Sequence, residues 1–253
     1  MYLKSCGVRS RATRIISWAV ALPVIAAAGC TAGERSPDRA EEAPPVRTES
    51  PSLPDERAAV VFLGTSLTAG LGLDPSEAYP ARIQQRIDEA GLPFSVVNAG
   101  VSGETSAGAR QRIDWLLQRP VSVLVVETGA NDGLRGLDPA ALRLNLDAIL
   151  ERARETNPEI ALVVVGMEAP PNLGTRYTNA FRGVFRDAAE EHGARFIPFL
   201  LEGVAGIESL NQGDGIHPTA EGHRRMAETV WRVLGPVLEE RAAAQAQQAA
   251  VAY

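Results

Sequence analysis

Four short stretches of the sequence combine hydroxyl, amide, carboxylate and imidazole side chains with glycine, and each comes after an apolar run. A serine hydrolase needs a nucleophile, a histidine that takes its proton, a carboxylate that orients the histidine, and donors for an oxyanion. Together the four stretches offer this set, which indicates hydrolysis by a serine nucleophile. They are Gly64-Thr65-Ser66, Ser102-Gly103-Glu104-Thr105, Gly129-Ala130-Asn131-Asp132-Gly133 and Asp214-Gly215-Ile216-His217-Pro218.

Each stretch taken alone has a plainer structural explanation. A serine after a strand is usually a helix cap. Ser102-Gly103, Asn131-Asp132-Gly133 and Asp214-Gly215 are common turn sequences with no function attached. These explanations leave open why all four stretches fall at the same edge of one predicted sheet.

The three histidines of the chain have different surroundings in the sequence. His192 precedes Gly193 in a last helical turn, where a cation suits the helix dipole, and His223 shares an apolar stripe with Met226, so both are expected to be structural. His217 lies in a loop, three residues after Asp214. The general base and its carboxylate are therefore predicted to be His217 and Asp214, with Ser66 as the nucleophile.

The elements that must position these residues alternate between apolar strands and helices of 10 to 20 residues. Parallel neighbours need such crossover connections, so we expect a three-layer α/β/α fold with a five-stranded parallel sheet, and a ligand site beyond the carboxyl ends of its strands. The strands are expected from Val60 to Gly64 and over Phe94–Ala99, Val121–Glu127, Ile160–Val165 and Arg195–Phe199, and the helices over Glu77–Gly91, Thr105–Gln118, Thr175–His192 and Thr219–Glu240 and from Pro139.

The same four stretches resemble the sequence blocks of the SGNH or GDSL hydrolases, in particular the bacterial periplasmic thioesterase/lysophospholipase and arylesterase branch. The resemblance covers about residues 59–238 and implies a flavodoxin-like fold. It also implies that Ser66 is the nucleophile, with an oxyanion hole formed by the backbone N–H groups of Ser66 and Gly103 and by the side-chain amide of Asn131. The departure from the family pattern is Thr65, where the family name calls for aspartate.

A proline-rich connection, Met167 to Tyr177, follows the fourth predicted strand at the same edge of the sheet. Its two prolines and its glycine suggest a shaped loop, and we expect Pro170, Leu173 and Tyr177 to line the acyl or alcohol pocket. The alternative is that this segment merely connects the strand to its helix.

The first 56 residues are expected to lie outside the fold. Residues 1–29 read as a signal peptide, with four basic residues, no acidic one and an apolar stretch from Ile15 to Ala28. The segment ends in Ala27-Ala28-Gly29-Cys30, similar to a lipobox although Leu is usual at the position of Ala27. Cys30 would then carry lipid and hold the exported domain on a membrane facing the periplasm; ordinary cleavage nearby and an uncleaved anchor are the alternatives.

The remaining boundaries follow from composition. Residues 30–56 contain five prolines, seven acidic residues and no aromatic, which predicts a disordered tether. Residues 57–240 form the predicted hydrolase domain, and residues 241–253 an Ala/Gln-rich tail that is expected to fray. Loss of the signal would leave 21 basic against 31 acidic residues, a net charge of −10, which argues against nucleic acid as a partner.

The expected activity is hydrolysis of small-molecule or lipid esters and thioesters through an acyl-enzyme. No metal or organic cofactor is implied, since two cysteines and three histidines offer little for a Cys/His metal site. The same constellation could instead remove acetyl groups from carbohydrate or cell wall, and a silent binding module is the alternative from another class. An α/β-hydrolase is disfavoured because the chain has no Gly-x-Ser-x-Gly elbow.

Overall fold

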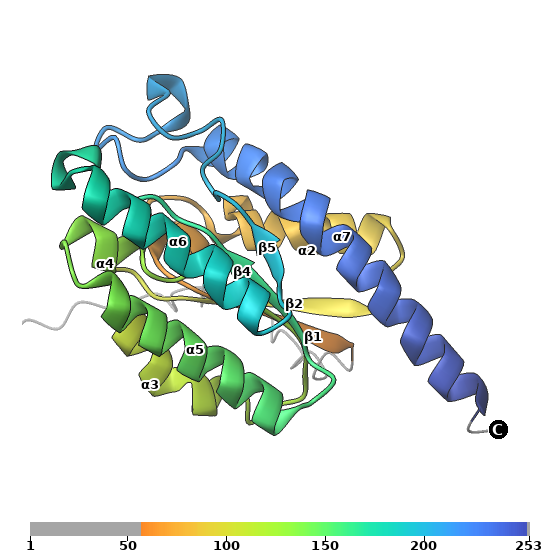
Figure 1. Cartoon of the computed structure of the whole chain (residues 1–253). Helices are drawn as coiled ribbons and strands as arrows, with labels where there is room; N and C mark the ends of the chain where they lie inside the picture. The colour runs from red at the N-terminus through yellow and green to blue at the C-terminus, as the bar shows by residue number, and fades with distance from the viewer. Residues whose placement is uncertain (1–56, 252–253) are drawn as a thin grey trace, which may run out of the picture. The chain divides into compact units, whose positions relative to one another are not determined.

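The computed structural model describes residues 57–251, which build a five-stranded parallel sheet in the order β2-β1-β3-β4-β5 (Figure 1). The predicted sheet is confirmed. The strands are β1 (Ala58–Gly64), β2 (Phe94–Gly100), β3 (Val121–Val126), β4 (Ala161–Val165) and β5 (Arg195–Ile197). Because the strand order reverses between β1 and β3, the crevice beyond their carboxyl ends is the expected ligand position in such a sheet.

Helices cover both faces of the sheet and make the three predicted layers. In Figure 1, α3, α5 and α6 lie on one side of the strands, and α2 and α7 lie on the other. The helices are α1 (Ser66–Ala69), α2 (Tyr79–Glu89), α3 (Ser106–Leu116), α4 (Ala130–Leu134), α5 (Pro139–Thr156), α6 (Thr175–Glu191) and α7 (Ala220–Val251), with single 3₁₀ turns η1 (Pro75–Glu77), η2 (Pro171–Leu173) and η3 (Glu208–Leu210).

The central strands are apolar because they are covered on both faces. All six residues of β3 are buried, as are six of the seven residues of β1. Phe62 of β1 meets Tyr79 of α2 edge to face, with ring centroids 5.6 Å apart. Burying a side chain of this size contributes about 1.5–3 kcal/mol, so the packing of α2 against β1 stabilises the strand that leads to Ser66.

The structure differs from the sequence prediction at three helices. Ser66 and Asn131 lie in the short helices α1 and α4, for which the sequence pattern predicts no helical range. The last helix was expected to end at Glu240 and instead continues to Val251. Alanine and glutamine favour helix, and the ten residues after Glu240 include no glycine or proline to stop it.

The predicted signal peptide (1–29) and tether (30–56) lie outside the described residues. Within residues 57–251, none of the helices combines the length and the apolar character that a membrane crossing requires.

Candidate active site

Ser66 lies on a tight connection between β1 and α1 at the carboxyl edge of the sheet. Thr65 is the N-cap of α1, and Gly70, with φ of 73°, ends the helix after a single turn. Gly64 makes the turn possible, since a Cβ at this position would lie 2.0 Å from Thr68 Oγ1. The chain therefore folds back directly behind the serine and places its hydroxyl at the end of the strand.

His217 and Asp214 reach Ser66 from the loop before α7. Ser66 Oγ lies 3.0 Å from His217 Nε2, and His217 Nδ1 lies 2.7 Å from Asp214 Oδ2. Asp214 Oδ1 accepts the backbone N–H groups of Ile216 at 2.9 Å and of His217 at 3.0 Å. The hydrogen bond from the His217 side chain, followed by these two N–H groups, holds the pKa of Asp214 well below its usual range.

This arrangement determines how the protons are shared. An ionised carboxylate can only accept, so the His217 proton lies on Nδ1 toward Asp214. Nε2 is then left with a lone pair that accepts the hydroxyl proton of Ser66. The three residues thus form a hydrogen-bonded chain that can draw a proton away from the serine.

Three donors lie beside the serine. The backbone N–H groups of Ser66 and Gly103 have no hydrogen-bond acceptor within residues 57–251. Asn131 Nδ2 donates one of its two protons to the carbonyl of Glu104, at 2.9 Å, and the other is uncommitted. Gly103 has φ of 79°, a left-handed conformation that favours glycine. The donors follow the carboxyl ends of β1, β2 and β3, the strands beside the position where the strand order reverses.

These groups open onto one cavity of about 270 Å³. Ser66, Gly103, Asn131 and His217 all line it. The rest of its wall is largely apolar and comes from five loops or short helices: Leu67, Leu71, Ala130, Leu134, Met167, Leu201 and Ile216, with Ser102 and Glu168. An apolar group attached to a carbonyl carbon can therefore lie beside the serine hydroxyl.

Comparison with known proteins places this geometry in a family. Residues 62–225 match the GDSL-like lipase/acylhydrolase family. This chain belongs to that family. It is 41% identical over 180 residues to esterase TesA of Pseudomonas aeruginosa, a match that covers 71% of this chain and 89% of TesA. It is also 34% identical over 180 residues to thioesterase 1/protease 1/lysophospholipase L1 of Escherichia coli K12, covering 71% of this chain and 84% of that protein.

A solved structure agrees with the fold. Psychrotrophic esterase EstA of a Pseudoalteromonas species, in a structure inhibited by monoethylphosphonate, superposes with a TM-score of 0.68 at 30% identity. The match covers 72% of this chain and 98% of EstA. Like its relatives in the GDSL family, the chain is a carboxylic ester hydrolase that acts on small-molecule esters.

Thr65, which replaces the aspartate of the GDSL name, is buried against the carboxylate of Glu127. Thr65 is 1% exposed, and its hydroxyl donates to the carboxylate of Glu127, 3.1 and 3.0 Å from the two oxygens. The backbone N–H of Thr65 donates to Glu127 Oε2 at 2.8 Å, and so does the Thr68 hydroxyl at 2.8 Å. One carboxylate therefore ties both ends of the turn that holds Ser66.

Glu127 is the residue of this site that sequence reasoning missed. It is fully buried at the end of β3, and burial raises its pKa from 4.5 to about 7, although the Thr65 and Thr68 hydrogen bonds work in the opposite direction. An aspartate at position 65 would face this carboxylate at hydrogen-bond distance, whereas a threonine supplies a proton. The feature of the sequence that could have indicated Glu127 is its position as an acidic residue directly after the six residues of a buried strand.

The loop from Met167 to Tyr177 contributes to the site differently from the sequence prediction. Met167 and Glu168 line the cavity beside Ser66, but Pro170, Leu173 and Tyr177 do not. Leu173 belongs to the 3₁₀ turn η2, and the Tyr177 hydroxyl donates to the carbonyl of Leu137 at 2.6 Å. The chain turns away after Glu168, so that the later residues of the loop brace the segment after α4.

The other two histidines have structural contacts. His192 Nε2 lies 3.1 Å from Asp147 Oδ1. His223 is 1% exposed, its Nδ1 accepts the backbone N–H of Tyr79 at 3.1 Å, and burial lowers its pKa to about 4. Across residues 57–251 there is no cluster of three or more His, Cys, Asp or Glu side chains that could hold a metal ion.

Proposed function

We propose that this esterase hydrolyses carboxylic esters and thioesters of apolar acyl groups through an acyl-enzyme on Ser66. The observation that carries the proposal is the hydrogen-bonded chain from Ser66 through His217 to Asp214 at the mouth of an apolar cavity. The thioester activity in the name of the Escherichia coli relative is consistent with the substrate class.

In the first half-reaction, His217 Nε2 takes the hydroxyl proton while Ser66 Oγ bonds to the substrate carbonyl carbon. Asp214 stabilises the imidazolium that forms, because its ionised carboxylate accepts from Nδ1. The N–H groups of Ser66 and Gly103 and the free proton of Asn131 donate to the oxyanion, which carries more charge than the ground-state carbonyl. His217 then returns the proton to the leaving alcohol or thiol, and the C–O or C–S bond breaks.

In the second half-reaction, water replaces the alcohol. His217 Nε2 takes a proton from the water while the water oxygen bonds to the acyl carbon. The second oxyanion then collapses, the bond between the acyl carbon and Ser66 Oγ breaks, and His217 returns the proton to Ser66 Oγ as the free acid leaves. The same donors serve both steps because each passes through an oxyanion at the same position.

The test is hydrolysis of aryl esters of increasing acyl length, matched acyl thioesters and acetylated sugars, with Ser66→Ala assayed beside the parent. Ser102→Ala is the matched control, since Ser102 lines the same cavity but takes no part in the hydrogen-bonded chain. We expect loss of turnover in Ser66→Ala only, and faster turnover of longer acyl groups. Full activity in Ser66→Ala would refute the nucleophile, and a preference for acetylated sugars would favour the deacetylase alternative.

We also propose that the enzyme is exported and tethered by lipid on Cys30. The support is sequence alone: a basic and apolar leader that ends in Ala-Ala-Gly-Cys, followed by a proline-rich acidic segment. Incorporation of labelled palmitate should be lost in Cys30→Ser and retained in Cys6→Ser, which changes the other cysteine of the chain. A parent protein without label would reject the anchor.

A further inference from the structure

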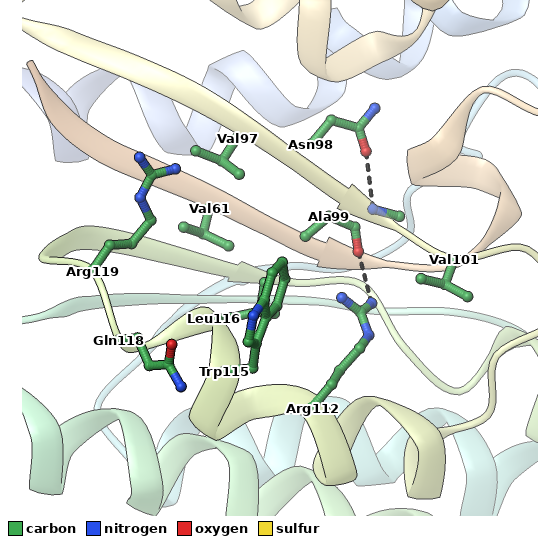
Figure 2. Close-up of a pocket in the computed structure, with 11 residues that line it drawn as sticks. Val61, Val97, Asn98, Ala99, Val101, Arg112, Trp115, Leu116, Gln118 and Arg119 are labelled. Carbon is green, nitrogen blue, oxygen red and sulfur yellow. Dashed lines mark hydrogen bonds between the residues drawn. The ribbon is translucent and has the colours of Figure 1, made fainter. Parts of the chain in front are cut away.

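A second, larger groove of about 510 Å³ runs along the edge strand β2, apart from the cavity beside Ser66. α2 covers one face of β2, where Gln84 Oε1 accepts the backbone N–H of Val96 at 2.6 Å. On the other face, α3 packs beside α5 and leaves part of β2 uncovered. Figure 2 shows the result: Val61, Val97 and Ala99 from the strands lie on one side of the groove, with Trp115 from α3 on the other.

The groove exposes apolar surface that a free protein usually covers. Trp115 is 68% exposed and Val101 is 44% exposed, and both belong to its wall. A contiguous exposed apolar surface marks a binding site more often than scattered apolar residues do. At about 3.3 Å per residue, the wall from Val97 to Val101 is roughly 13 Å long, which suits an alkyl chain of medium length.

The charge of the groove is opposite to that of the chain as a whole. The sequence has 31 acidic and 25 basic residues, yet the groove is lined by two arginines and no carboxylate. Arg112 is neutralised by an ion pair with Glu104, whose carboxylate it contacts at 2.7 Å. Arg119 is exposed and has no hydrogen-bond or ion-pair partner in the described part of the chain, so its charge is available to a ligand.

We propose that this groove is a second, non-catalytic binding site for an aliphatic carboxylate. The alkyl chain lies along Val97 and Ala99 against Trp115, and the carboxylate pairs with Arg119 at the end of the groove far from Val101 (Figure 2). The acid released by ester hydrolysis belongs to this chemical class. Binding in the groove goes beyond the proposed hydrolysis, because it uses none of the three residues Ser66, His217 and Asp214.

The groove is separate from the catalytic cavity but adjacent to it. Val101 lines the groove, whereas the next two residues, Ser102 and Gly103, line the cavity. The loop that carries Gly103 therefore lies between a ligand in the groove and the catalytic cavity. Binding in the groove can be measured in a variant that does not hydrolyse esters.

The test uses sodium decanoate with the full chain carrying Ser66→Ala, so that its result does not depend on hydrolysis. Calorimetry gives the affinity, and tryptophan emission gives the location. We expect a saturable change in emission that is lost in Trp115→Phe and retained in Trp231→Phe. Retention of the change in Trp115→Phe would place the ligand elsewhere and overturn the proposal.

Charge and shape are tested by two further variants. Arg119→Glu should weaken decanoate binding about tenfold, because it replaces attraction by repulsion at an exposed position. Arg110→Glu, an exposed arginine of α3 outside the groove, is the matched control and should not change the affinity. Ala99→Phe fills the groove and should abolish the change in Trp115 emission. The change that decanol produces should not respond to Arg119→Glu, because decanol carries no charge. An emission change with the same decanoate dependence in the Ser66→Ala chain and after addition of Arg119→Glu or Ala99→Phe would overturn the proposal.

Discussion

Replacement of Glu127 by glutamine should remove a pH-dependent loss of stability that the buried carboxylate imposes. Glutamine keeps the size of the side chain and an oxygen that can accept the Thr65 N–H, while its amide group can donate to the nearby threonine hydroxyls. The substitution therefore tests the charge of Glu127 rather than its packing.

The magnitude follows from the change in pKa on folding. The pKa of Glu127 rises from 4.5 to about 7, so the folded protein holds this proton more tightly than the unfolded chain does. The stabilisation is fully present below pH 4.5 and is lost as the pH rises through 7. Between pH 5 and pH 8 this group should lower the free energy of unfolding of the parent by about 2–3 kcal/mol.

The measurement is the difference between parent and Glu127→Gln in urea unfolding at several pH values. A difference is needed because His223, whose pKa is lowered to about 4, stabilises the parent as the pH rises through 4 to 6.5 and partly cancels the Glu127 effect. His223 is present in both proteins, so its contribution subtracts out. Relative to the parent, the glutamine variant should gain about 2–3 kcal/mol from pH 5 to pH 8.

The control is Glu89→Gln, which removes the carboxylate of an exposed glutamate of α2 and leaves the buried contacts of Glu127 unchanged. A Glu127→Gln difference that stays constant from pH 5 to pH 8 would refute the reasoning, since the carboxylate would then have the same proton affinity in the folded and unfolded chain.

Three further predictions concern the same site. Thr65→Asp introduces the residue that the family name calls for and should place its carboxylate at hydrogen-bond distance from that of Glu127. The free energy of unfolding should then fall more steeply with rising pH than in the parent; an unchanged pH dependence in urea unfolding would contradict this. Asn131→Ala should lower kcat on aryl esters by about 10²–10³-fold with little change in KM, because the donor acts on the oxyanion; a rise in KM at constant kcat would assign it to substrate binding instead. Asp214→Asn should lower kcat by on the order of 10³–10⁴-fold, because the amide can donate to His217 Nδ1 and so favour the wrong tautomer; near-parental activity would show that His217 needs no orienting carboxylate.

The sequence by itself determined the fold class and the composition of the catalytic edge. Apolar runs such as Val121–Val126 alternate with long helices, and this alternation permits little besides a parallel sheet covered on both faces. Since the carboxyl ends of parallel strands share an edge, the sequence alone predicts that Ser66, Gly103 and Asn131 lie at one site. His217 and Asp214 could be chosen because local spacing alone brings them together.

Other features depended on contacts between segments far apart in the chain. The hydrogen bonds between Glu127 and Thr65 join residues that are 62 positions apart. No local sequence pattern shows that the carboxylate after β3 contacts the turn after β1. The sequence predicts that the loop at Met167 lies at this edge of the sheet, but only the packed structure decides which of its side chains face the cavity. The groove along β2 exists because α3 leaves an edge strand partly uncovered, and helix placement of this kind is settled by packing, which the order of apolar and polar residues does not specify.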